Sequence, residues 1–285
     1  MATDLTTWPS PAKLNLFLHI TGQRENGYHD LQSVFQLLDY GDSLTFDVNN
    51  SGKIRIESNI NAIPLQENII YKAATLLQTY AKCSLGCDIT LNKVLPMGGG
   101  VGGGSSNAAT TLVALNHLWR LGLSTQALQS LGLQLGADVP IFVFGQNAFA
   151  EGVGEKLSGI SLPEKYFLVV NPSVHISTQK IFQHPDLPRN TASISRESYA
   201  FSDTHNDCQN LVCDMYPDIA KTLGWLLEYA PSRMTGTGSC LFSIYDTYEA
   251  ALETLNKLPT QCSGFVAKGV NKSPLLEKLQ QLQNK

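Results

Sequence analysis

The sequence predicts an α+β fold with two lobes, and three observations support that prediction. The chain has 285 residues and 43% hydrophobic content, enough for one large or two ordinary domains with real cores. Strand-like segments come first and helix-like segments follow, whereas helices and strands alternate over a small sheet in the second half. A new series of strand-like and helix-like segments begins at 162–164. We therefore expect one domain at 1–160 and a second at 161–285.

The first lobe begins with a strand and a turn. Residues 12–20 alternate cleanly, with Leu14, Leu16 and Leu18 on the face opposite Lys13 and Asn15, which is typical of a half-buried strand. The next segment, Arg24–Gly27, contains the Asn-Gly turn signal. We then expect a strand at 31–38, a turn at 39–42, and two short paired strands at 44–48 and 53–56.

Helices dominate the rest of this lobe. Apolar spacing predicts a helix over 68–80, and a strand at 89–94 then leads into a glycine run. A long apolar helix follows at 108–119, with Ser105 or Ser106 as its N-cap. Ser124 is expected to cap a further helix through Leu135, which ends at Gly136–Pro140.

The second half has a less regular pattern. Short apolar pieces occur at 142–144 and 149–150, a polar irregular segment at 184–204 and a second glycine turn at Thr235–Cys240. Strands are expected at 166–171, 240–244 and 264–270, and helices at 210–215, 219–228 and 248–258.

Composition excludes several classes of function. A net charge of −4 without a basic block argues against a nucleic-acid partner. No apolar run reaches membrane-spanning length, and the N-terminus lacks the features of a signal peptide. Six cysteines form no Cys-x-x-Cys pair, which favours free thiols and a cytoplasmic protein. The histidines do not have the spacing of metal ligands, so no metal ligand is identified. The sequence does not decide between a monomer and a homodimer.

The most informative segment is the glycine run from Pro96 to Ser106. Glycines let backbone N–H groups converge on one point, and a helix N-terminus adds unpaired N–H groups with partial positive charge. Such a cradle favours anions, and the phosphates of a nucleotide above all. No Asp or Glu lies between Asp88 and Asp138, which suits a polyanion site and also a buried pair of helices.

Three specific interpretations of this run, a Walker A loop, a dinucleotide-binding loop and a flexible linker, are each opposed by a feature of the sequence. A Walker A loop needs a lysine where Ser105 follows Gly104. Gly98, Gly100 and Gly103 match a dinucleotide fingerprint, but the acid expected about 20 residues later is absent. A flexible linker rarely leads into an apolar helix with a serine cap.

Several residues outside the run have two interpretations on local pattern alone. Lys13 is either an edge residue facing water or an inward functional group. Asp138 is favoured as a turn former, with a general base as the alternative. Tyr28 and Phe182 are either core aromatics or rings that stack on a base, and pattern favours core for Phe182. The second glycine turn slightly favours close approach by a ligand over an ordinary hairpin.

Taken together, the segments resemble one family. Pro96–Ser106 resembles the glycine loop of the galactokinase, homoserine kinase, mevalonate kinase and phosphomevalonate kinase (GHMP) superfamily. The ordered set Pro9–Leu16, Gly27–His29, Pro96–Ser106, Gly136–Pro140 and Gly236–Ser239 is similar to that of one branch of this superfamily. That branch phosphorylates the 2-hydroxyl of 4-diphosphocytidyl-2-C-methyl-D-erythritol with ATP in the non-mevalonate isoprenoid route. The resemblance covers nearly the whole chain, and 184–207 is its weakest stretch.

The resemblance implies a two-lobed GHMP-kinase fold, with a ribosomal-S5-like first lobe and a ferredoxin-like second lobe. It implies ATP and Mg²⁺ as cofactors and a cytidine diphosphate derivative as the small-molecule substrate. By position, Asp138 matches a catalytic base and Lys13 the lysine that keeps it ionised. The implied ATP-binding residues are Pro96, Met97, Gly98, Gly99, Gly100, Val101, Gly102, Gly103, Gly104, Ser105 and Ser106, with Asn68 and Lys93 near the adenine. The implied substrate-binding residues are Asn15, Tyr28, His29, Thr178 and Phe182.

Three rival functions remain. The nearest is another GHMP kinase acting on mevalonate or homoserine, acceptors that carry no base for Tyr28 and Phe182 to hold. An RNA-binding module of the ribosomal type is opposed by the acidic balance. A dinucleotide-dependent oxidoreductase is opposed by the missing ribose acid.

Overall fold

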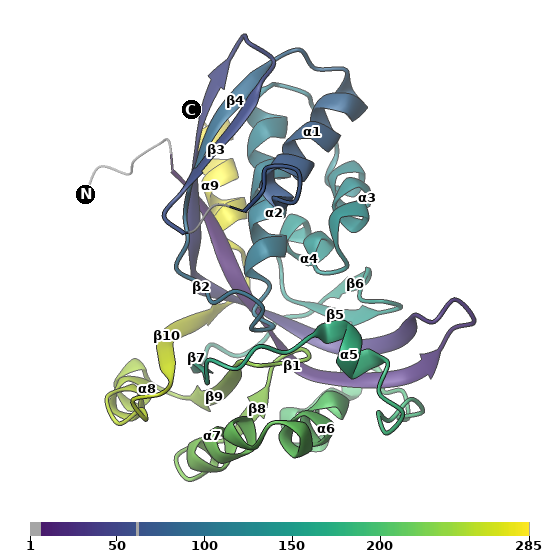
Figure 1. The fold of residues 1–285 in the computed structure, drawn as a ribbon, viewed down its shortest axis with the longest axis vertical. Coiled ribbons are helices and arrows are strands. Elements are labelled where there is room, and N and C mark those ends of the chain that lie inside the picture. Colours follow the sequence, from purple (N-terminus) through teal and green to yellow (C-terminus); the bar gives the residue numbers. More distant parts are fainter. Residues whose placement is uncertain (1–6, 61–62, 285) are drawn as a thin grey trace.

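One mixed sheet runs through the whole molecule and carries helices at both of its ends (Figure 1). The computed structural model describes residues 7–60 and 63–284. The strand order is β3-β4-β2-β10-β7-β9-β8, with β1 and β5 paired to β2, and β6 to β5. The strands are β1 (Thr7–Gln23), β2 (His29–Asn49), β3 (Ile54–Ser58), β4 (Gly86–Asn92), β5 (Ala148–Glu151), β6 (Lys156–Gly159), β7 (Tyr166–Asn171), β8 (Ser232–Met234), β9 (Leu241–Tyr245) and β10 (Ser263–Val270).

The helices form two groups. Figure 1 shows α1–α4 beside β2–β4 at one end, and α6–α8 beside β7–β10 at the other. The helices are α1 (Ile69–Ala81), α2 (Gly103–Leu118), α3 (Thr125–Leu135), α4 (Val139–Phe144), α5 (Thr178–Phe182), α6 (Asp207–Met215), α7 (Pro217–Leu227), α8 (Tyr248–Leu255) and α9 (Pro274–Gln283). Each group covers its own apolar core, so the predicted α+β class is confirmed.

The two ends are joined by pairing of β10 with β2, at Gly269 opposite Leu38 and Val270 opposite Leu37. Helix α9 then packs its Leu275 into the core of the first helix group. The expected division between 1–160 and 161–285 falls in the connection from β6 to β7 and stays a prediction.

Most sequence-predicted elements are present within a few residues of their expected bounds. The Asn68 side chain caps α1 by accepting from the Ile70 N–H, and Ser124 caps α3 by accepting from Ala127. The predicted strand at 166–171 is β7 without change, and the polar segment at 184–204 holds only two short 3₁₀ turns, Arg196–Ser198 and Phe201–Asp203. Helices α4, α5 and α9 and strands β6 and β8 were not predicted.

The turn expected at 39–42 is wrong, because β2 passes straight through it. A side chain at Gly41 would come within 2.2 Å of the Ser10 carbonyl oxygen, so glycine serves close strand packing here. The carboxylate of Asp42 is fully buried. It accepts hydrogen bonds from the backbone N–H groups of Val94 and Leu95, which lie just after β4. Tertiary contacts thus override the local turn signal.

The strands expected to pair at 44–48 and 53–56 do not touch each other. Strand β4 lies between them, antiparallel to β2 and parallel to β3. Local pattern cannot show that a later strand enters this gap.

The N-cap expected for α2 is also wrong. The helix begins earlier, at Gly103, and its N-cap is Gly102 with φ 75° and no side-chain cap. A side chain at Gly102 would meet the Phe142 ring at 2.7 Å and the Lys13 Cε at 3.1 Å. Ser105 and Ser106 therefore lie within the first turn, where the buried Ser106 hydroxyl accepts from Ser10 at 2.9 Å.

Candidate active site

Two cavities meet at the glycine run. The first has a volume of about 460 Å³ and lies between the run, α1 and β3–β4. The second, of about 840 Å³, lies between β1, the β1–β2 turn, α5 and the second glycine turn. Four residues line both cavities: Gly100, Ser105, Asp138 and Thr178. Molecules bound in the two cavities would therefore approach each other beside Asp138.

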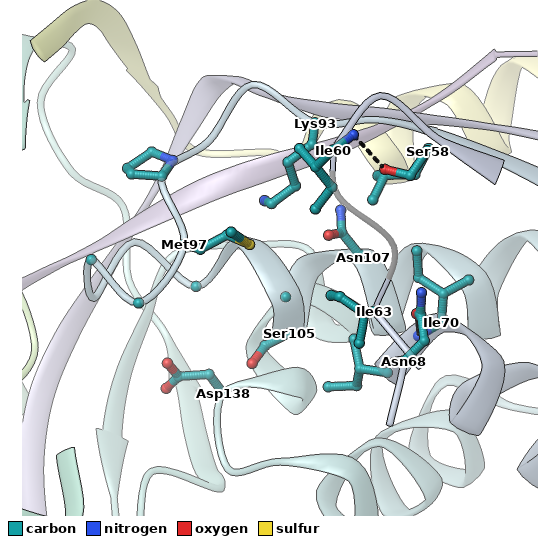
Figure 2. Close-up of a pocket in the computed structure, with 18 of the residues that line it drawn as sticks. Ser58, Ile60, Ile63, Asn68, Ile70, Lys93, Met97, Ser105, Asn107 and Asp138 are labelled. Atoms are coloured by element: carbon teal, nitrogen blue, oxygen red, sulfur yellow. Dashed lines mark hydrogen bonds between the residues drawn. The ribbon is translucent and has the colours of Figure 1, made fainter. Parts of the chain in front are cut away.

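The first cavity has a polar end and an apolar end (Figure 2). The glycine run and the start of α2 form the polar end, with Ser105 and Asp138 below the run. No acidic residue occupies the first turn of α2, so its free N–H groups suit an anion. Ile63, Ile70 and Asn68 lie at the opposite end. The arrangement suits a ligand with phosphates at one end and a flat apolar group at the other.

The second glycine turn packs directly on the first. A side chain at Gly100 would lie 2.4 Å from the Thr235 carbonyl oxygen, and Cys240 donates its N–H to the Gly99 carbonyl at 3.1 Å. The Thr235 hydroxyl accepts from the Asn15 N–H at 2.9 Å. The turn therefore joins the glycine run to β1, while Gly236 and Thr237 line the second cavity.

Lys13 and Asp138 form an ion pair between the cavities. Nζ of Lys13 lies 3.1 Å from Oδ2 of Asp138 and donates to Oδ1 of Asn15 at 2.5 Å. The Asn15 amide in turn donates to the Ser33 hydroxyl at 2.9 Å. Lys13 is only 2% exposed, so its location on β1 is inward, but the Asp138 side chain is 38% exposed and makes no capping bond to α4. This carboxylate keeps oxygen lone pairs available to a ligand.

A second lysine–aspartate pair lies beside Gly103 of the glycine run. Nζ of Lys93 is 2.5 Å from Oδ2 of Asp42, and both side chains are buried. The same carboxylate accepts from the backbone N–H groups of Val94 and Leu95 at 2.8 Å and from the Asn107 amide at 3.0 Å. Asp42 thus ties the residues before the run to the helix after it. Sequence reasoning missed Asp42 and Asn107, since a turn signal concealed the first.

The second cavity is lined by the predicted aromatic residues. His29 and Phe182 stack on each other, with ring centroids 5.2 Å apart and planes inclined by 27°. Tyr28 is 63% exposed at the cavity wall, and Thr178 shares a 2.9 Å hydrogen bond with Thr237. One face of Phe182 is therefore already covered by His29.

Arg189 contacts His29 from the polar segment at 184–204 and was not predicted. Its Nε donates to His29 Nε2 at 3.1 Å. Burial, and then the positive charge of Arg189, lower the pKa of His29. His29 is therefore uncharged at neutral pH.

Comparisons with known proteins identify the family. Residues 68–146 match the model of the GHMP kinases N terminal domain, and residues 189–264 match GHMP kinases C terminal. A 4-diphosphocytidyl-2-C-methyl-D-erythritol kinase of Pseudoalteromonas atlantica is 59% identical over 282 residues, 99% of each chain. One from Vibrio cholerae is 54% identical over 284 residues, covering 100% of this chain and 98% of its own.

Solved structures of two kinases match the fold of this chain. A crystal structure of 4-(cytidine 5'-diphospho)-2C-methyl-D-erythritol kinase matches 93% of this chain and 99% of its own, with a TM-score of 0.82 and 29% identity. Methanococcus jannaschii mevalonate kinase, at 15% identity and a TM-score of 0.67, covers 95% and 100% of the two chains and shares the fold. The fold is that of the GHMP kinases. Within that class, the chain belongs to the 4-diphosphocytidyl-2-C-methyl-D-erythritol kinase family.

Proposed function

We propose that the protein transfers the γ-phosphoryl group of ATP to the 2-hydroxyl of 4-diphosphocytidyl-2-C-methyl-D-erythritol, giving the 2-phosphate and ADP. The 2-phosphate is an intermediate of the methylerythritol phosphate route to isoprenoid precursors. The observation that carries this proposal is the meeting of two cavities at Asp138. ATP occupies the cavity with the glycine run, and the cytidyl substrate occupies the larger one.

Asp138 is the proposed base. Its carboxylate accepts the proton of the 2-hydroxyl while that oxygen forms a bond to the γ-phosphorus, and the bond from the γ-phosphorus to ADP breaks. The Lys13 ammonium lies 3.1 Å from the Asp138 carboxylate. It stabilises the negative charge of that carboxylate and of the phosphoryl group during transfer. Asn15 fixes the direction of Lys13 through the 2.5 Å bond. Backbone N–H groups of the glycine run stabilise the phosphate oxygens without reorganising.

Mg²⁺ fits the residues present. This ion takes oxygen ligands, and in nucleotide sites it is held by one or two side chains together with phosphates and water. Ser105 lines both cavities and offers such an oxygen. The bound ion would neutralise charge on the phosphates.

The aromatic side of the second cavity suits the cytosine ring. Tyr28, His29 and Phe182 gather in a cavity of about 840 Å³, and mevalonate or homoserine has no ring to place there. Asn68 and Lys93 at the first cavity stay predicted neighbours of the adenine. All six cysteines are free, which suits the reducing cytoplasm. No helix within the described residues is long and apolar enough to cross a membrane.

The test is ADP release with three acceptors under identical conditions: the cytidyl substrate, mevalonate and homoserine. The proposal expects rapid release with the cytidyl substrate alone. Equal or faster release with mevalonate or homoserine would overturn it.

A further inference from the structure

Arg189 has every arm of its guanidinium engaged. Nη1 and Nη2 donate to four backbone carbonyls in and just after α5, those of Phe182, His184, Pro185 and Leu187, at 2.7–3.4 Å. The remaining Nε donates to His29 Nε2 at 3.1 Å. The side chain is therefore fixed in direction, and its bond to His29 is set by the surrounding backbone.

The chemistry of this bond determines the state of His29. A guanidinium only donates and stays charged at every working pH. Nε2 must therefore supply a lone pair, which an imidazolium cannot do because both of its nitrogens carry protons. His29 is then neutral, and its single proton is on Nδ1.

We propose that Arg189 is a positioning residue that holds His29 in the neutral, Nδ1-protonated tautomer, so that His29 presents a hydrogen-bond donor to the ligand of the second cavity. The geometry supports the second half of this statement. His29 lines that cavity, and no residue in the described ranges 7–60 and 63–284 has a hydrogen bond to Nδ1. Phe182 stacks on the ring and limits its rotation.

The tautomer selects what His29 reads, a step that rests on the proposed function. A cytosine ring offers acceptors at N3 and O2 and a donor at its 4-amino group. An Nδ1–H group matches the two acceptors and opposes the amino group. The other tautomer would present a lone pair from Nδ1 and reverse this preference.

The first test is independent of any substrate. Nitrogen NMR of the intact protein distinguishes protonated from unprotonated imidazole nitrogens, and the His29 signals are assigned by their loss in His29→Asn or His29→Gln. At pH 7.5 we expect a protonated Nδ1 and an unprotonated Nε2. A protonated Nε2 would overturn the proposal even if the cytidyl substrate is the true acceptor. The expected signals would uphold it even if another acceptor were found.

The second test separates tautomer control from simple anchoring of the α5 segment. Arg189→Met should raise the KM for the cytidyl substrate about fivefold to tenfold, the effect of one hydrogen bond, with little change in kcat or in the KM for ATP. Arg196→Met removes an exposed arginine of the same segment, paired with Glu197, and should change none of these.

His29→Asn provides the decisive background. An asparagine amide nitrogen lies about where Nδ1 lies and donates without any tautomer to control. In that background Arg189→Met should raise the acceptor KM less than about twofold, so the two changes are coupled. Arg189→Lys, which keeps a cation that only donates, should restore part of the wild-type KM when His29 is present. Equal increases from Arg189→Met in both backgrounds would reduce Arg189 to an anchor and overturn the proposal.

Discussion

Two lysine–aspartate pairs lie on either side of the glycine run, and they differ in what surrounds the carboxylate. Asp42 is buried and accepts from Lys93, Asn107 and two backbone N–H groups. Asp138 pairs with an equally buried lysine, yet its own side chain is 38% exposed and lines both cavities. The same two residue types thus form a structural pair and a chemical pair.

The difference teaches how the role of a charged pair is recognised. A carboxylate with four donors has no free lone pair well placed for a proton, and it stabilises the chain segments that bond to it. A carboxylate held by one lysine and open to ligands can accept a proton in a reaction. Burial of the lysine does not distinguish the two pairs, because Lys13 and Lys93 are both inside.

The largest effect is expected for Asp138→Asn. The amide cannot accept the hydroxyl proton, so kcat should fall by about 10²–10⁴-fold. The KM for ATP should change less than about threefold, because the phosphate cradle is built from the glycine run. Steady-state ADP release measures both values, and near-normal turnover would exclude Asp138 as the base.

Asp42→Asn should instead destabilise the fold. It leaves the Lys93 charge buried without its partner, and breaking a buried pair from one side costs about 3–5 kcal/mol. Chemical denaturation measures the free energy of unfolding, and Asp47→Asn, an exposed aspartate on the same strand, is the matched control. A loss below about 1 kcal/mol would remove the distinction between the two pairs.

Tyr28→Ala tests the acceptor side of the comparison. Stacking on a base contributes about 1–3 kcal/mol, and Tyr28 is well exposed, so the KM for the cytidyl substrate should rise about fivefold. Tyr80→Ala removes a similarly exposed tyrosine on α1 and should leave that KM unchanged. An effect confined to the KM for ATP would contradict the placing of the cytosine ring.

The smallest effect concerns pH. His29 has an ordinary pKa of 6.5, which burial and the facing charge of Arg189 lower. The nearby Asp30 carboxylate is bonded to Arg24. Because the pKa is lowered, His29 stays neutral as pH falls through 6.5, and the acceptor KM should rise only below that value. Arg189→Met should move this rise to higher pH, which KM measured from pH 5.5 to 8 would detect.

Local pattern was enough for some of these residues and not for others. Alternation on the first strand was enough to place Lys13 and Asn15 on one face. It left the inward direction of Lys13 open, and local pattern favoured a turn former at Asp138, so the proposed roles of both residues came from the family resemblance. Asp42 could not be found, because Asp-Tyr-Gly-Asp has the composition of a turn and its burial comes from packing of β1 and of residues 94–95. Arg189 lies in a segment without periodicity, and bonds from a side chain to backbone carbonyls leave no mark in sequence.

The most direct test of the contrast between the two pairs measures ATP dissociation constants, unfolding free energies and single-turnover rates together in Asp138→Asn and Asp42→Asn. We expect Asp138→Asn to bind ATP and resist denaturant like the wild type while losing the chemical step. Asp42→Asn should lose stability and ATP affinity, yet transfer phosphate at more than a tenth of the wild-type rate when saturated. If Asp138→Asn keeps its rate, or if both variants lose rate, affinity and stability alike, the two pairs do not have the separate roles assigned to them.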